Sequence, residues 1–154
     1  MLMFSEAVSL ALHGALLLAS SGGPRTSREL AREMGASEAH LAKVMRRLAK
    51  AGFVRATPGP GGGYVLSEKA GERSLLDVYE LIDGPFEVRR CLLDKPICGG
   101  RRCLFGDLLE ETHRRLRERL AGTRLRDLKG ALADASRSVE DAGGGAGRDG
   151  GDGA

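Results

Sequence analysis

Two short helices around a glycine turn, followed by a glycine-rich hairpin, are the pattern that most restricts how this chain can fold. Thr26, with Glu29 three residues later, makes a capping-box sequence that opens the first short helix, and Gly35 ends it. Ser37 caps a second helix, which Gly52 stops in the usual C-terminal position. Four apolar residues recur at helical spacing along this second helix: Leu41, Val44, Met45 and Leu48.

Two short apolar runs follow, at residues 53–57 and 64–66, and the six residues between them are all glycine or proline. Valine and an aromatic residue in each run favour strands, and the Gly-Pro segment favours a turn. Helix, turn, helix and hairpin in this order predict a winged helix-turn-helix with a short β-hairpin wing. The fold class expected for the whole chain is mainly α.

Further helices are predicted on both sides of this unit. A helix over residues 5–19 is rich in alanine and leucine on nearly every side, so we expect it to pack between other elements. Ser74, with Asp77 three residues later, offers a cap for another helix, which Gly84 and Pro85 end. The segment with the cysteines follows directly.

A long amphipathic helix is predicted after the cysteines. From Leu104 to Leu120 an apolar residue or threonine recurs every fourth position, which draws an apolar stripe along the helix. Because no later domain covers this stripe, we expect it to form a homodimer interface. Thr123 is expected to cap a further short helix with three leucines, before a glycine-rich tail without a fold. The predicted parts are the winged domain over residues 1–84, a cysteine loop over 85–103, the long dimerisation helix and short C-terminal helix over 104–142, and a disordered tail over 143–154.

The positive charge is concentrated in the predicted winged unit. Residues 1–70 carry nine Lys or Arg against five Asp or Glu. This excess favours an anionic partner, and the second helix of a helix-turn-helix enters the major groove of double-stranded DNA. Residues near the start of that helix meet base edges, whereas later basic residues contact phosphates. The predicted base contacts are Ser37, Glu38, Ala39, His40 and Lys43, and the predicted phosphate contacts are Arg46, Arg47 and Lys50.

The wing is predicted to make a second contact with the DNA. Glycine has no Cβ, so the backbone of Gly61, Gly62 and Gly63 can lie close to a phosphate or in a narrow groove. Arg55, on the first strand of the hairpin, would supply positive charge there.

The three cysteines, Cys91, Cys98 and Cys103, all fall in one short window. Thiolates are soft ligands for zinc, copper(I) and iron-sulfur clusters, so this clustering indicates a metal or redox site. Zinc commonly takes two close cysteine pairs, and only Cys98 and Cys103 come near that spacing. Three buried free thiols and a Cys98–Cys103 disulfide switch are the alternatives. The arginines that would offset the charge of a thiolate-bound centre are Arg89, Arg90, Arg101 and Arg102.

Several classes of protein are disfavoured. The odd number of cysteines, and the lack of a basic segment before the apolar run at residues 7–19, favour the reducing cytoplasm over secretion. That run is too short to cross a bilayer, so no membrane partner is expected. The three histidines lie far apart, without a nucleophile motif or phosphate loop, so we do not expect an enzyme. His113, on the arginine-rich helix, is predicted to lie at the surface.

The residues of the predicted winged unit also resemble a known family. The resemblance is carried by Gly35-Ala36-Ser37, Leu41, Leu48, Gly52 and Val54, and then by the run Gly59-Pro60-Gly61-Gly62-Gly63-Tyr64-Val65-Leu66. With the cysteines downstream, these residues resemble the Rrf2 family of bacterial transcription regulators over about residues 3–132. Members related to the iron-sulfur biogenesis and nitric-oxide-sensing regulators are dimers that hold an iron-sulfur cluster. The resemblance therefore implies Cys91, Cys98 and Cys103 as ligands of a 2Fe-2S or 4Fe-4S cluster.

Two positions differ from the pattern of the iron-sulfur members. Pro58 precedes the glycine run where an arginine is common, so Arg55 becomes the candidate for a minor-groove contact. Gly106 stands three residues after the last cysteine, where the biogenesis regulators have a histidine. The fourth ligand must then come from elsewhere, and His13 matches a histidine that the partner subunit supplies in a redox-sensing branch. The other candidates are Asp107, Glu6 and a small thiol.

We therefore expect a dimeric DNA-binding regulator, a repressor in the simplest case, whose operator binding is controlled by an iron-sulfur cluster or another redox or metal centre. The alternative is a redox or electron-transfer protein that uses the helix-turn-helix only for assembly. DNA affinity that falls steeply with salt separates the two, because only the regulator neutralises phosphates.

Overall fold

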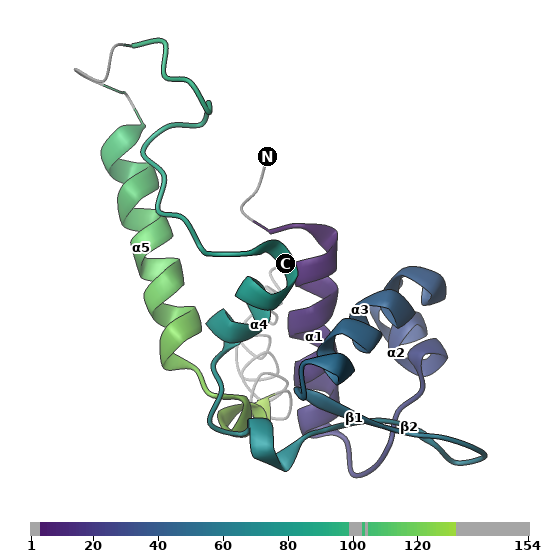
Figure 1. Ribbon diagram of the computed structural model, residues 1–154. Coiled ribbons are helices and arrows are strands. Elements are labelled where there is room, and N and C mark those ends of the chain that lie inside the picture. Colours follow the sequence, from purple (N-terminus) through teal and green to yellow (C-terminus); the bar gives the residue numbers. More distant parts are fainter. Residues whose placement is uncertain (1–3, 99–102, 104, 132–154) are drawn as a thin grey trace, which may run out of the picture.

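The computed structural model describes residues 4–98, 103 and 105–131 (Figure 1). The predictions made for Arg101, Arg102, Leu104, Leu132 and the glycine-rich tail lie outside the described residues. The mainly α winged helix-turn-helix is confirmed. In chain order the elements are α1 (Glu6–Ser20), α2 (Ser27–Met34), α3 (Glu38–Lys50), β1 (Val54–Thr57), β2 (Gly63–Leu66), the 3₁₀ helix η1 (Glu68–Ala70), α4 (Leu75–Asp83), α5 (Gly106–Gly122) and the 3₁₀ helix η2 (Leu125–Leu128).

Side-chain caps fix where the two helices of the helix-turn-helix begin. The Thr26 hydroxyl accepts the N–H of Glu29, and the Glu29 carboxylate accepts the N–H of Thr26 at 2.7 Å, which completes the predicted capping box of α2. The bond from the Thr26 N–H lowers the pKa of Glu29 most, and a second bond, which the Thr26 hydroxyl donates to the same carboxylate at 2.9 Å, lowers it further. Gly35 then adopts φ +62°, a left-handed conformation that favours glycine, and Ser37 caps α3 through the N–H of His40.

The wing is a two-stranded antiparallel sheet in which Val54 pairs with Leu66 and Thr57 with Gly63. Its glycines are required by the hairpin itself. A Cβ on Gly62 would lie 2.2 Å from the carbonyl oxygen of Thr57, and one on Gly63 would lie 2.6 Å from the backbone of Arg25. Arg25 and Tyr64 exchange two backbone hydrogen bonds. The segment before α2 therefore pairs with β2 through an isolated antiparallel bridge.

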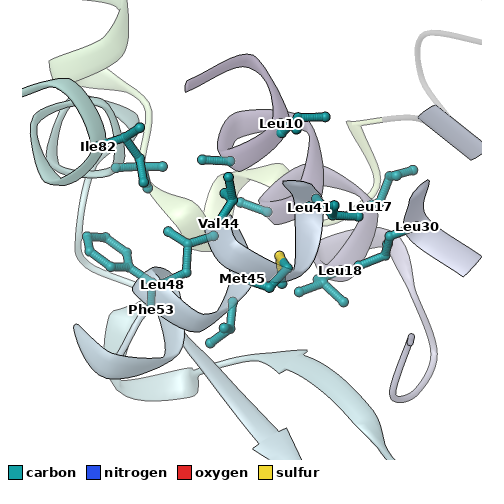
Figure 2. Close-up of a cluster of buried hydrophobic side chains, with 14 of the residues drawn as sticks. Leu10, Leu17, Leu18, Leu30, Leu41, Val44, Met45, Leu48, Phe53 and Ile82 are labelled. Carbon is teal, nitrogen blue, oxygen red and sulfur yellow. The ribbon is translucent and has the colours of Figure 1, made fainter. Parts of the chain in front are cut away.

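The main core lies between α1 and α3 (Figure 2). The four apolar residues predicted on the inner face of α3 are all buried. The two helices come so close that a Cβ on Gly14 of α1 would lie 3.4 Å from the sulfur of Met45. Leu125 and Leu128 of η2 complete this core, although they follow α5 in the sequence. The chain therefore returns to the winged unit after the long helix.

A second, smaller cluster joins α4 to the C-terminal half of α5. Its buried members are Leu76, Phe86 and Leu120, with Leu116 partly buried against them. Leu108, nearer the start of α5, is 64% exposed. Residues four apart on an α-helix are rotated by about 40°, so Leu108 and Leu120 point about 120° apart and cannot both face α4.

The prediction that Thr123 caps a following helix is wrong. The Thr123 hydroxyl donates backwards to the carbonyl of Arg119 at 2.9 Å, so Thr123 ends α5. The next turn, η2, begins instead at Arg124, whose N–H is accepted by the carboxylate of Asp127. Within the described residues, no helix is both long and apolar enough to span a membrane.

Candidate DNA-binding face and cysteine segment

The outer face of α3 carries the positive charge expected of a recognition helix. Burial of its apolar side against α1 leaves Lys43, Arg46 and Lys50 exposed on the other side. Ser37 and Ala39, at the start of the helix, are exposed as well. The geometry places these five predicted contact residues on an accessible surface. Their contact with DNA stays a prediction.

Two predicted base contacts at the start of α3 already have partners within the chain. The carboxylate of Glu38 lies 3.3 Å from Nε of Arg28 on α2. His40 is half-buried, and its ring lies 3.6 Å from the carboxylate of Glu6 on α1. Glu38 therefore lies beside α2, whereas His40 is turned towards α1.

Arg47 makes contacts that the sequence pattern did not indicate. Its guanidinium donates to the carbonyl oxygens of Leu81 at 2.8 Å and Ile82 at 3.1 Å. These carbonyls belong to the last turn of α4, where helical C=O groups lack partners inside the helix. A cation there also interacts favourably with the helix dipole. Arg47, predicted as a phosphate contact, thus ties α3 to the end of α4.

The wing presents the exposed basic side chain of Arg55 and the exposed glycines Gly59 and Gly61 at its tip. Arg55 projects from β1 into solvent. Gly61 has φ +71° and nothing within 4 Å of a Cβ built on it, and the same holds for Gly59 in the same turn, at φ +86°. Gly62 and Gly63 are half-buried and face their own chain. Only Gly61, of the three predicted wing glycines, has open space on its Cβ side.

The described part of the cysteine segment, residues 91–98, projects past the start of α5, at the opposite end of the molecule from the wing (Figure 1). Cys91 and Cys103 are half-buried, Cys98 is exposed, and all three are free thiols. Cys91 lines an open hollow of about 410 Å³, and its sulfur accepts the N–H of Leu93 at 3.4 Å. Because Cys98 is exposed, the alternative of three buried thiols is wrong, whereas a Cys98–Cys103 disulfide switch stays a prediction.

The donor chemistry of the segment fits an iron-sulfur cluster, since three free thiols are the ligands such clusters take. Within the described residues, however, no three histidine, cysteine or acidic side chains are gathered closely enough to hold a metal ion. Gly106 packs directly on this segment, because a Cβ there would lie 3.1 Å from Cβ of Cys103. The start of α5 thus fills the space beside Cys103 with backbone.

The arginines that flank Cys91 are paired with carboxylates of the chain. Arg89 bonds Glu87 and Asp94, at 3.2 and 2.9 Å, and both interactions raise its pKa, the Glu87 bond most. Arg90 bonds Glu110 at 2.9 Å and also reaches Asp107. Asp107, a candidate fourth ligand, is itself fully exposed.

His113 is buried, which corrects the prediction of a surface residue. Its Nδ1 accepts the backbone N–H of Arg89 at 2.8 Å, and its ring meets the edge of Phe86. The helical period of the sequence already indicates that His113 is buried. His113 lies three residues before Leu116 and seven before Leu120, so it shares their face of α5. The apolar stripe predicted from Leu104 to Leu120 counts every fourth residue, and His113 does not fall on that count.

His13 is exposed on α1, so it is not a core histidine. Its Nδ1 donates to the carbonyl of Ser9 at 2.7 Å, so Nε2 is the nitrogen that this bond does not use. Beside it, α1 and α2 form a groove of about 430 Å³ that also includes Glu33 and Met34. Nothing in the described residues brings His13 together with the cysteines as a three-ligand site. Its role as fourth ligand stays a prediction.

Comparison with known proteins gives a consistent assignment. The family model described as Rrf2, iron-dependent transcriptional regulator, matches residues 4–131. The regulator IscR of Xenorhabdus nematophila is 32% identical over 111 residues, which cover 72% of this chain and 68% of that protein. IscR of Klebsiella pneumoniae is 34% identical over 105 residues, covering 68% of this chain and 62% of that protein.

A solved structure with the same fold is that of CymR, the global cysteine regulator of B. subtilis. It superposes with a TM-score of 0.64 at 26% identity and covers 85% of this chain and 98% of CymR. These relatives are transcriptional regulators and not enzymes. The winged fold, the exposed basic helix and the match over residues 4–131 together show that this chain belongs to the Rrf2 family of transcriptional regulators.

Proposed function

We propose that two copies of this chain bind one operator in double-stranded DNA, each through α3 and its wing. The observation that carries the proposal is that α3 is amphipathic, with a buried apolar side and an exposed basic side. One side is fixed in the core, and the other offers Lys43, Arg46 and Lys50 to solvent. A rigidly held basic helix is what insertion into the major groove requires. Regulation of transcription by relatives such as IscR supports this reading.

The second copy is proposed to pack on the start of α5 and on the cysteine segment. The C-terminal half of α5 is covered by α4, but large apolar side chains are exposed at its start: Leu108 in the first turn and Phe105 just before the helix. More exposed apolar residues of the neighbouring segment are Val88, Leu92, Leu93 and Ile97. Large apolar side chains gathered at one end of a molecule favour a partner surface.

The three thiols are proposed to hold an iron-sulfur cluster, with His13 of the second copy as the candidate fourth ligand. When bound, the cluster would supply a centre whose oxidation or loss changes the order of the cysteine segment. The donor set supports this, as three free thiols lie within one segment. Nε2 of His13 is the atom left for ligation, because Nδ1 is bonded to Ser9.

A continuous set of contacts leads from the cysteine segment to the recognition helix. Arg89, two residues before Cys91, is held by His113, and His113 packs on Phe86. Phe86 lies three residues after the end of α4 and donates its N–H to the carboxylate of Glu80. The last carbonyls of α4 accept from Arg47 of α3. We propose that ordering of the segment is transmitted along these contacts to the angle of α3.

DNA binding is tested by titrating labelled duplex fragments at several salt concentrations. Arg46→Ala and Lys50→Ala, which each remove a predicted phosphate contact, should each lower affinity and reduce the slope of log K against log salt by about 0.9. Arg117→Ala is the matched control, because it removes an exposed positive charge from α5. Equal effects of all three variants, or no salt dependence in the unmodified protein, would refute the proposed binding face.

The cluster is tested separately by the absorption spectrum and by iron and sulfide analysis of protein purified without oxygen. Cys91→Ala and Cys103→Ala should each abolish the visible absorption, and His13→Ala should shift it. A colourless, iron-free protein with intact thiols would exclude the cluster and leave the DNA-binding proposal standing.

A further inference from the structure

We propose that Glu38 recognises a cytosine in each half-site and that Arg28 positions it while contacting a neighbouring phosphate. The proposal rests on α3 being the recognition helix, as inferred above. It adds the identity of one base and a residue, Arg28, outside the predicted contact set. The juxtaposition that carries it is an acidic side chain at the tip of a basic helix, paired with an arginine of α2.

Glu38 is the first residue of α3, the end that enters the groove in a helix-turn-helix. Its side chain is 51% exposed and that of Arg28 is 83% exposed. An ion pair this exposed contributes about 0–1 kcal/mol to stability, and an acidic residue in the first turn adds about as little. The Glu38–Arg28 pair therefore contributes little to the stability of the fold. We explain its position by contact with DNA.

A carboxylate at this position can make favourable contacts with only a few groups of DNA. Phosphates repel it, so it must lie at the base edges. There, guanine presents the acceptors N7 and O6, thymine presents the acceptor O4, and adenine places the acceptor N7 beside its amino group. Cytosine alone presents the N4 amino donor without a neighbouring acceptor, and an ionised carboxylate only accepts. Cytosine is therefore the base that Glu38 fits.

Arg28 is placed to steady this contact. In a helix-turn-helix the helix before the recognition helix crosses the phosphate backbone, and Arg28 lies on that helix, α2. Its bond to Glu38 uses Nε. A guanidinium carries four further N–H donors on its two terminal nitrogens, and these suit a phosphate. Through its Nε, Arg28 would thus orient the Glu38 carboxylate and offset the negative charge of that carboxylate beside the DNA.

The test is selection of binding sites from a random duplex library, followed by affinity measurements at fixed salt. The unmodified protein should select one constant cytosine per half-site. In Glu38→Gln the preference for that cytosine should fall by about 5- to 150-fold and shift towards adenine, which a glutamine reads through N6 and N7. Arg28→Ala should weaken binding to all sequences, flatten the salt slope and partly relax the same preference.

Glu33→Gln is the matched control. It removes the same charge from α2 at a residue paired with Arg25, 2.6 Å away, and it should leave base preference unchanged. If Glu38→Gln raises affinity equally for every sequence, or keeps the cytosine preference, Glu38 acts only through its charge and the proposal is overturned. A protein that selects no sequence at all would instead refute the proposed DNA binding on which it rests.

Discussion

Substitution of Leu125 tests whether the segment after α5 is part of the winged domain. Leu125 has no exposed surface and lies in the main core, packed with residues of α1. Its backbone is fixed on both sides. The N–H of Leu125 donates to the carbonyl of Arg73 at 2.9 Å, and that of Arg126 donates to the carbonyl of Gly71 at 3.1 Å. The loop therefore cannot move inward to fill a cavity.

Leu125→Ala should consequently cost more than a substitution at a site free to relax. Buried leucine-to-alanine changes cost about 2–5 kcal/mol, and the fixed backbone places this one at about 3–5 kcal/mol. For a chain of this length roughly 2–4 °C is lost per kcal/mol, so the melting temperature should fall by about 6–20 °C.

The assay is urea unfolding followed by circular dichroism, with the thermal midpoint as a second measure. Arg117→Ala is the control, because Arg117 is exposed on the C-terminal half of α5 and lies outside both the core and the proposed dimer surface. Its unfolding free energy should change by less than about 0.5 kcal/mol. A loss below about 1 kcal/mol for Leu125→Ala would show that the site relaxes or that η2 is not needed by the core, against the fixed-backbone reasoning.

Three further predictions concern contacts between elements and one cap. Arg47→Ala should reduce the difference in operator affinity between thiol states, because it cuts the link from α4 to α3; DNA titrations of reduced and oxidised protein measure this. His113→Phe leaves the N–H of Arg89 without its acceptor and should lower the unfolding free energy by about 1–3 kcal/mol in urea. Glu29→Ala should lower the melting temperature at neutral pH. Because folding lowers the pKa of Glu29 below 4.5, its contribution is complete above that pH and disappears as the pH falls through the lowered value, so the two melting curves should converge in acid.

Local chemistry made much of the winged unit predictable. The capping box of Thr26, the left-handed turn at Gly35 and the cap at Ser37 each involve residues within four positions of one another. The buried face of α3 followed from helical period alone, and so did the exposure of its basic face. The family resemblance in the same stretch was confirmed by the match over residues 4–131.

The tertiary structure decided the features that join distant parts of the chain. Arg47 meets carbonyls 34 and 35 residues later, and His113 accepts from a residue 24 positions earlier. The return of η2 into the core, and the division of α5 into a covered and an exposed half, are of the same kind. Within the winged unit, the sequence determined where helices and turns begin and end, because caps and backbone angles depend on near neighbours. It left open which faces meet, because that depends on how whole elements pack in space.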